Sequence, residues 1–123
     1  MKALTIKQPY ASLIVNNYKE YEFRSWNTNY RGKILIHAGL SKYSNLNDFN
    51  MYNLDYIYGA IIGEAYIVDS IKVDKEFDSY LHKLNNLVYA GDHVDLYAWK
   101  LENIVKYDKP IFVKGKLGLW NYE

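Results

Sequence analysis

Apolar and polar residues alternate along much of the chain in the way that β-strands require. Six segments of this kind are predicted, and they cover residues 3–7, 19–26, 33–38, 58–69, 93–101 and 111–116. Apolar residues spaced three and four apart predict a short helix over residues 10–15 and a second helix after Asp74, which can cap its N-terminus. The polar segment 41–55 is expected to be a loop with one helical turn near residues 46–52.

The order of these segments favours a mostly antiparallel sheet over a doubly wound one. Only the gap between Ile71 and His93 is long enough to hold a convincing helical crossover. We therefore expect an α+β fold, in which about six short, mostly antiparallel strands form a small β-barrel decorated by two or three helices. The chain shows no repeat, linker or low-complexity segment, so residues 1–123 are expected to form a single domain.

Composition narrows the classes of function that fit this chain. Its 123 residues carry a net charge of +1, which excludes a broadly cationic nucleic-acid-binding protein, so an anionic partner requires a local basic site. The absence of cysteine excludes disulfides, thiolate catalysis and cysteine-based zinc sites. No stretch reaches 18 apolar residues and the N-terminus has no cleavage signature, so we expect a cytoplasmic protein without a membrane partner.

Neither a metal nor a cofactor is expected. The three histidines are His37, His82 and His93, and no pair has a zinc-ligand spacing such as H-E-x-x-H. The sequence also lacks a Gly-rich phosphate loop, a dinucleotide-binding fingerprint and a serine nucleophile elbow.

A charged group on the second predicted strand is the first candidate for chemistry. Glu22 and Arg24 are two residues apart, so on a strand their side chains share one face, and Lys19 at the helix–strand junction can turn onto the same face. Such a group can hold a phosphate or carbonyl oxygen and accept a hydrogen bond from a base amino group. The lysine can also act as a base or nucleophile if its pKa is lowered. The alternative is a solvated strand face that makes weak surface ion pairs.

Two neighbouring segments offer further candidates. Arg31 follows the aromatic Tyr30 in a polar loop, so the arginine can contact a phosphate while Trp26 or Tyr30 stacks on a base; a simple turn with a solvated arginine fits equally well. Gln8 and Ser12 lie near the start of the first predicted helix, where backbone N–H groups attract anions, but ordinary helix capping also explains them.

The segment 17–24 resembles the G-x-K-x-x-E-x-R motif of the ASCH domain family, the activating signal cointegrator homology domain, with Asn17 at the position of the glycine. Similar residues flank the motif and recur to the end of the chain, in segments 8–13, 24–26, 30–32, 59–63, 97–99 and 115–120. The resemblance therefore covers nearly the whole chain. It implies a PUA-like β-barrel with a cleft beside it.

The resemblance implies that this cleft binds RNA or a nucleotide-like ligand, with Lys19, Glu22 and Arg24 at its floor. It also raises a second function, because some small ASCH-like proteins are acetylcytidine amidohydrolases and others are reported as ribonucleases. In that case Lys19 would be the nucleophile or base, although Glu22 stands where the amidohydrolase branch has a threonine. A third interpretation, a purely structural barrel, would require Glu22 and Arg24 to form a closed, buried ion pair with no cavity beside them.

Overall fold

A computed structural model of the chain describes residues 1–43 and 45–123. It has an α+β fold, in which a six-stranded mixed sheet is accompanied by two α-helices and one 3-10 helix. The strands are β1 (Lys2–Gln8), β2 (Tyr21–Arg24), β3 (Gly32–Lys42), β4 (Ala60–Lys72), β5 (Tyr97–Phe112) and β6 (Leu119–Asn121). The helices are α1 (Tyr10–Val15), the 3-10 helix η1 (Leu46–Tyr52) and α2 (Lys75–Leu84). None of the described helices has the length and apolar character needed to cross a membrane.

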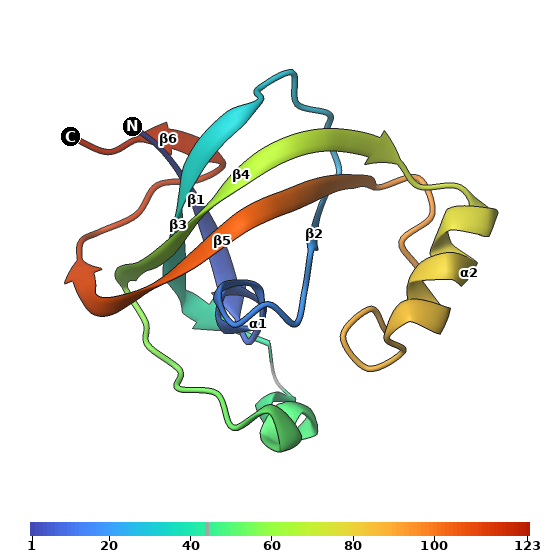
Figure 1. Cartoon of the computed structure of the whole chain (residues 1–123), viewed down its shortest axis with the longest axis horizontal. Coiled ribbons are helices and arrows are strands. Elements are labelled where there is room, and N and C mark those ends of the chain that lie inside the picture. The colour runs from blue at the N-terminus through green and yellow to red at the C-terminus, as the bar shows by residue number, and fades with distance from the viewer. Residues whose placement is uncertain (44) are drawn as a thin grey trace.

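The sheet is curled and barrel-like, as expected from the sequence. Its strand order is β2-β5-β4-β3-β1-β6; β1 and β3 run parallel and all other neighbours run antiparallel. Figure 1 shows the sheet curving so that β2 stands across from β1. The side chain of Arg24 spans this opening, because its Nη2 donates a 2.9 Å hydrogen bond to the Thr5 carbonyl. A side chain thus links two strands that are not neighbours in the sheet.

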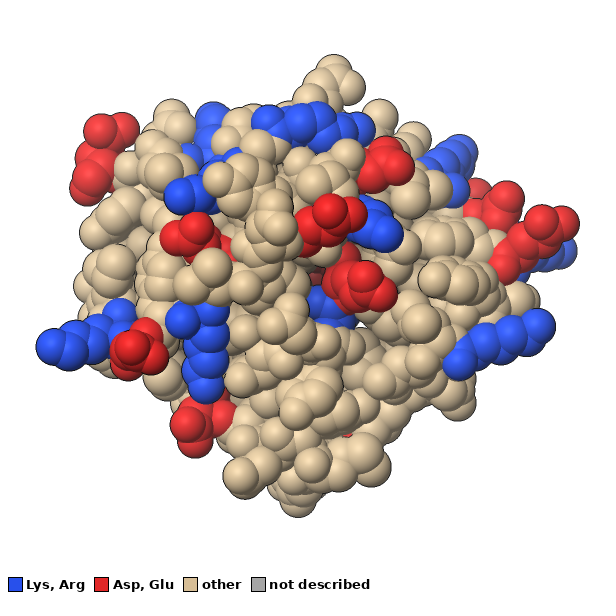
Figure 2. All heavy atoms as spheres, in the orientation of Figure 1, with Lys and Arg blue, Asp and Glu red and all other residues tan. Residues whose placement is uncertain are grey.

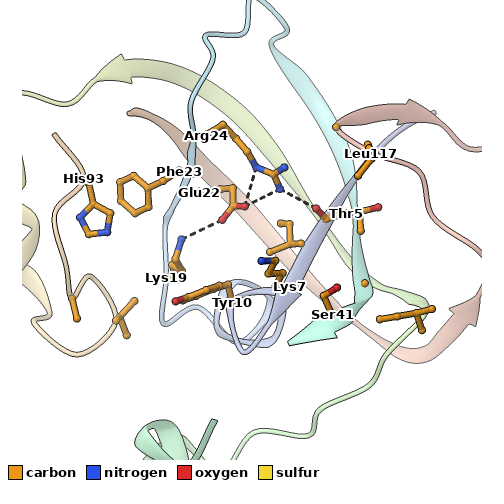
Figure 3. A pocket seen from close by; sticks show the side chains of 16 residues that line it. Thr5, Lys7, Tyr10, Lys19, Glu22, Phe23, Arg24, Ser41, His93 and Leu117 are labelled. Atoms are coloured by element: carbon orange, nitrogen blue, oxygen red, sulfur yellow. Dashed lines mark hydrogen bonds and ion pairs between the residues drawn. The ribbon is translucent and has the colours of Figure 1, made fainter. Parts of the chain in front are cut away.

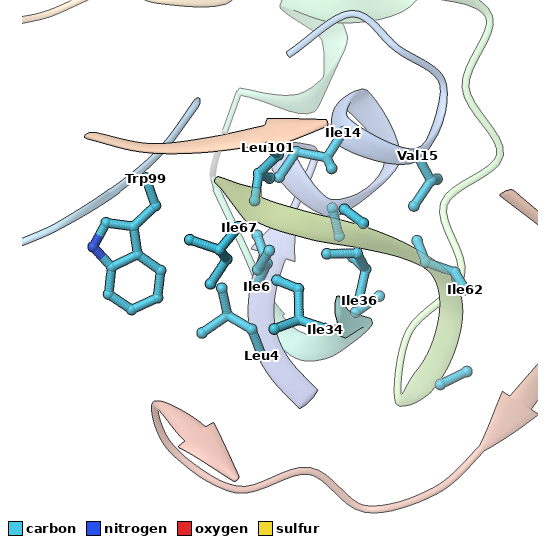
Figure 4. Close-up of a cluster of buried hydrophobic side chains, with 14 residues drawn as sticks. Leu4, Ile6, Ile14, Val15, Ile34, Ile36, Ile62, Ile67, Trp99 and Leu101 are labelled. Atoms are coloured by element: carbon cyan, nitrogen blue, oxygen red, sulfur yellow. The ribbon is translucent and has the colours of Figure 1, made fainter. Parts of the chain in front are cut away.

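The main core fills the inside of the curled sheet and is closed at one end by α1 (Figure 4). The short helix is held by packing, since its residues Ile14 and Val15 are buried against the sheet. Gly63 on β4 makes this packing possible: a Cβ there would lie 2.5 Å from the Val105 carbonyl and 2.7 Å from a methyl group of Val15. The sequence predicted a bulge or a close backbone approach at Gly63, and the structure has both.

The C-terminal strands differ from the prediction. Segments 93–101 and 111–116 were expected to be two strands joined by a loop containing Pro110, but β5 is one strand that begins at Tyr97 and continues through Pro110. Proline is tolerated there because residues 107–110 lie at a bulge, between the pairs of Lys106 and Ile111 with β4, and have no partner in the register. The sixth strand is β6, which the sequence left as a tail. Residue 44, within the predicted 41–55 loop, lies outside the described residues.

Helix α2 begins where the sequence predicted. The Asp74 carboxylate accepts a 2.8 Å hydrogen bond from the backbone N–H of Phe77, which is an N-cap interaction. Leu81 is buried in a second core cluster that also contains Val88 and Tyr89 from the loop after the helix, residues 85–96. The position of that loop therefore depends on α2.

We expect Asp74→Ala to lower the free energy of unfolding by about 1 kcal/mol, because it removes the N-cap acceptor. Asp74→Asn is the matched control, since an asparagine oxygen can accept the same hydrogen bond. It should lower the free energy of unfolding by at most a few tenths of what Asp74→Ala costs. Urea unfolding followed by circular dichroism measures both. Equal stability of Asp74→Ala and the wild-type protein would contradict this interpretation of the helix start.

Candidate functional site

A cavity of about 500 Å³ opens between β2 and β1 (Figure 3). The cavity is surrounded by residues of four elements, β1, β2, α1 and β3, and by the 85–96 loop and the segment before β6. The lining residues are Thr5, Ile6, Lys7, Tyr10, Lys19, Glu22, Phe23, Arg24, Gly39, Leu40, Ser41, Val88, Ala90, His93, Leu117 and Gly118. The three motif residues predicted from the sequence, Lys19, Glu22 and Arg24, all belong to this wall.

Glu22 lies between the two cations of the motif. Its Oε1 is 3.3 Å from Lys19 Nζ, and its Oε2 accepts hydrogen bonds from Arg24 Nε at 3.1 Å and Nη2 at 2.9 Å. The side chains of Lys19 and Glu22 are 3% and 10% exposed, and that of Arg24 is 20% exposed. These are not surface ion pairs, and since a cavity lies beside them, they are not a closed structural pair either.

Lys19 reaches the site because Asn17 adopts a φ of 66°, a left-handed conformation that asparagine tolerates and that turns the chain from α1 into β2. The Lys19 ammonium donates to the Tyr21 carbonyl and to Glu22. Three aromatic rings surround it, with centroids at 4.8 Å for Phe23, 5.4 Å for Tyr10 and 5.9 Å for Tyr89. Burial lowers the pKa of Lys19, and the carboxylate of Glu22 opposes this shift by favouring the charged form.

The cavity wall is positive although the chain is almost neutral. Three basic residues, Lys7, Lys19 and Arg24, face a single acid, Glu22. Arg24 uses Nε and Nη2 for Glu22 and the Thr5 carbonyl, while its Nη1 has no hydrogen-bond partner among the described residues. In contrast, basic and acidic side chains are intermingled on the molecular face drawn in Figure 2. The arrangement favours an anionic group beside Arg24.

Gln8 and Ser12, the two candidates at the start of α1, do not line the cavity. Both are buried, and their polar atoms are used within the fold. Gln8 Nε2 donates to the Ile57 carbonyl and its Oε1 accepts from the Ser12 N–H, whereas Ser12 Oγ donates to the Asp55 carbonyl. The two side chains therefore attach the segment before β4 to α1, which is closer to the capping interpretation than to anion binding.

The candidates after β2 lie outside the cavity wall. Trp26 is 42% exposed, packs edge-on against Trp99 and comes near Gly118, which belongs to the wall. Tyr30 donates its hydroxyl proton to the Lys33 carbonyl. Arg31 donates to the carbonyls of the loop that contains it, at Thr28 and Tyr30. Of the three, Trp26 is the one beside the rim of the cavity.

Several wall residues were not predicted as site residues. Phe23 stacks on His93, with ring centroids 4.1 Å apart, and together they form an aromatic wall near Lys19. Leu40 and Leu117 are strongly exposed and line the cavity, so they give it an apolar rim. An exposed leucine within a polar segment is visible in a sequence, but its position beside a motif about 20 or 90 residues away is set by the fold.

One cluster of potential metal ligands lies next to this wall. Ligand atoms of Asp78, His82 and His93 are all within 4.8 Å of one another. Only His93 belongs to both the cluster and the cavity lining.

Comparison with known proteins agrees with the sequence resemblance. A family model described as ASCH domain matches residues 4–111. Among solved structures, ASCH from Zymomonas mobilis is 16% identical, with a TM-score of 0.57 over 90% of this chain and 72% of that chain. A mutant of the same protein is 17% identical, with a TM-score of 0.54 over 90% and 74%. At these identities the likeness concerns the fold. No curated protein matches the sequence.

The lowered pKa of Lys19 predicts a pH effect on stability. In the unfolded chain Lys19 has the ordinary pKa of 10.5, whereas in the folded protein its pKa is lower. At pH values between the two, Lys19 is therefore protonated more often in the unfolded chain than in the folded protein. The contribution of Lys19 to the free energy of unfolding should therefore rise with pH. We expect the wild-type protein to gain stability relative to Lys19→Met as the pH increases from about 7 towards 10.5, measured by urea unfolding at several pH values.

Lys100→Met is the control for this effect. The nearby Tyr21 raises the pKa of Lys100, so this lysine is protonated in both states well below 10.5, and its contribution to stability should be constant at first and then fall as the pH approaches 10.5. A constant or falling difference for Lys19→Met would contradict a lowered pKa of Lys19.

Proposed function

This chain belongs to the ASCH domain family, and from that premise we propose that residues 1–123 form a single domain that binds RNA or a nucleotide-like ligand in the cavity beside β2. The observation that carries the proposal is the Arg24 guanidinium, which lines a cavity of about 500 Å³ with one nitrogen unpaired among the described residues. A cavity of this volume is within the range of small-molecule sites, so it accommodates one nucleotide unit better than a helical duplex.

The contacts of the cavity residues suggest a role for each of them in ligand binding. Arg24 would bind a phosphate or carbonyl oxygen through Nη1, in a wall whose basic residues outnumber its acids. Glu22 holds both cations, and because a carboxylate has about four acceptor positions, it can still accept from the amino group of a base. The ring pair formed by Phe23 and His93 offers an apolar face for the base.

Trp26 would stack on a nucleotide that lies outside the cavity. Its ring is partly exposed and lies near Gly118 at the rim, where the next base of a single strand can stack. Tyr30 and Arg31 follow in the same loop, and we propose them only as contacts to RNA beyond that nucleotide. Their side chains contact carbonyl groups of the chain and, for Arg31, the Asp69 carboxylate, so a bound strand would have to reach them from outside.

We expect Arg24→Ala to weaken binding of single-stranded RNA and of nucleoside 5′-monophosphates at least tenfold, because it removes the unpaired cationic donor. Fluorescence anisotropy with labelled oligonucleotides and isothermal titration calorimetry with the monophosphates measure these affinities. RNA binding by Arg24→Ala should also depend less on salt, because about one phosphate contact is lost. The slope of log affinity against log salt concentration should become shallower by about 0.7. The double variant with Lys19→Ala should abolish binding.

Two variants control for an effect on folding. Arg31→Ala removes an exposed arginine outside the cavity and should reduce RNA affinity only slightly. Lys7→Ala removes a lysine that is exposed at the cavity and should weaken binding by about two- to tenfold without disturbing the Glu22 contacts. Unchanged affinity in Arg24→Ala, or an equal loss in Arg31→Ala, would contradict the proposed site.

The lowered pKa of Lys19 favours a second candidate function, hydrolysis of an acylated nucleoside or of RNA in the same cavity. Lys19 would be the nucleophile or base, Glu22 would orient it and accept a proton, and Arg24 would stabilise the developing negative charge. The present contacts favour binding, because the Lys19 ammonium already donates to the Tyr21 carbonyl and to Glu22.

Incubation with a panel of acylated cytidines and RNA oligonucleotides tests the second candidate. A hydrolase should release product at a rate that Lys19→Met reduces by at least 100-fold, which is the usual size of an acid–base contribution. Arg31→Ala should keep the full rate on the acylated cytidines, which occupy only the cavity, because Arg31 lies outside it. Binding without turnover across the panel would leave the binding function alone.

A further inference from the structure

We propose that Asp78, His82 and His93 form a binding site for one divalent transition-metal ion of the zinc type, which links α2 to the 85–96 loop. The sequence did not predict such a site, because no two histidines have a familiar zinc-ligand spacing. The structure brings the three side chains together from two segments: Asp78 and His82 lie four residues apart on one face of α2, and His93 comes from the loop that returns past the helix.

The distances suit a tetrahedral ion. In a site with metal–ligand bonds of about 2.0–2.2 Å, ligand atoms lie about 3.3–3.6 Å apart. Asp78 Oδ1 is 3.6 Å from His82 Nε2 and 2.9 Å from His93 Nδ1. All three ligand atoms lie within 4.8 Å of one another, so side-chain rotations would bring them around one ion. Two imidazoles and a carboxylate form a donor set that zinc prefers over magnesium or calcium.

The hydrogen bonds of this cluster hold its three ligand-bearing side chains beside a backbone carbonyl. His82 Nε2 is 2.6 Å from the Gly91 carbonyl and 3.6 Å from Asp78 Oδ1, so its one hydrogen bond goes to the carbonyl and not to the carboxylate. Asp78 Oδ1 also accepts from the backbone N–H and from Nδ1 of His93. A metal ion would replace these hydrogen bonds by binding the two imidazole nitrogens and the carboxylate, and the Gly91 carbonyl or a water would complete four ligands.

The site is partly shielded from solvent, which favours a specific ion over loose surface binding. The side chains of Asp78 and His93 are 11% and 13% exposed, and that of His82 is 35% exposed. The ring of His93 is also held in place by its stacking on Phe23. Bound metal would therefore hold the aromatic wall of the ligand cavity, although the metal site itself does not depend on the identity of that ligand.

Calorimetric titration of zinc into the untagged, chelator-treated chain tests the proposal. We expect saturable binding of one equivalent and a rise in the thermal unfolding midpoint. Asp78→Asn, His82→Gln and His93→Gln should each weaken zinc affinity at least tenfold. Asp92→Asn, which changes an exposed carboxylate in the same loop, should bind like the wild-type chain.

Cobalt gives a second readout that a purely structural role would not produce. The wild-type chain should show the visible absorption of four-coordinate cobalt, and His82→Gln should lose it while remaining folded by circular dichroism. His82 is the most exposed of the three, so its replacement is the least disruptive to folding. His82→Gln therefore tests the metal site even if a variant at Asp78 or His93 fails to fold. Absence of saturable zinc binding, or equal binding by wild type and His82→Gln, would overturn the proposal.

Discussion

The fold around the cavity depends on one carboxylate. Glu22 compensates two cations that have been removed from water, and without it Lys19 would be a buried charge with aromatic rings and one carbonyl around it. Such a charge is costly, because the attraction between partners is what offsets the loss of hydration. Since β2 has only four residues and pairs on one side with β5, the contact from Arg24 to β1 also fixes its free side. The same group therefore forms the cavity and supports its wall.

This arrangement leaves an excess of positive charge. Glu22 carries one negative charge against two cations, and the Arg24 guanidinium, which lines the cavity, keeps one nitrogen without a hydrogen-bond partner among the described residues. A near-neutral protein can in this way attract an anionic group at one place without attracting polyanions over its whole surface. Aromatic side chains around the Lys19 ammonium exclude water from the inner half of the site. The lysine and the arginine thus have different roles although they share a partner.

Local features of the fold were predictable from sequence, and non-local ones were not. The two-residue spacing of Glu22 and Arg24 predicts a shared face, and Asp74 predicts a helix start, because each interaction lies within a few residues. The continuity of β5 through Pro110 was missed, since it depends on the bulge in the pairing of β5 with β4. The sequence also gave no sign that the 85–96 loop would form a cavity wall. The predicted strand count was right partly because joining two segments into β5 was balanced by the additional β6.

The long outer edge of β5 has a consequence for how the protein behaves at high concentration. Beyond Leu101, whose N–H donates to the Glu20 carbonyl, described β5 residues have a backbone ladder only with β4, so this edge presents hydrogen-bonding groups to other molecules. Unprotected edges of this kind promote aggregation by edge-to-edge pairing. Here Pro110 removes one donor, and charged residues precede it on the strand, namely Lys106, Asp108 and Lys109. The proline that obscured the strand in the sequence is thus also one of the features that protect its edge.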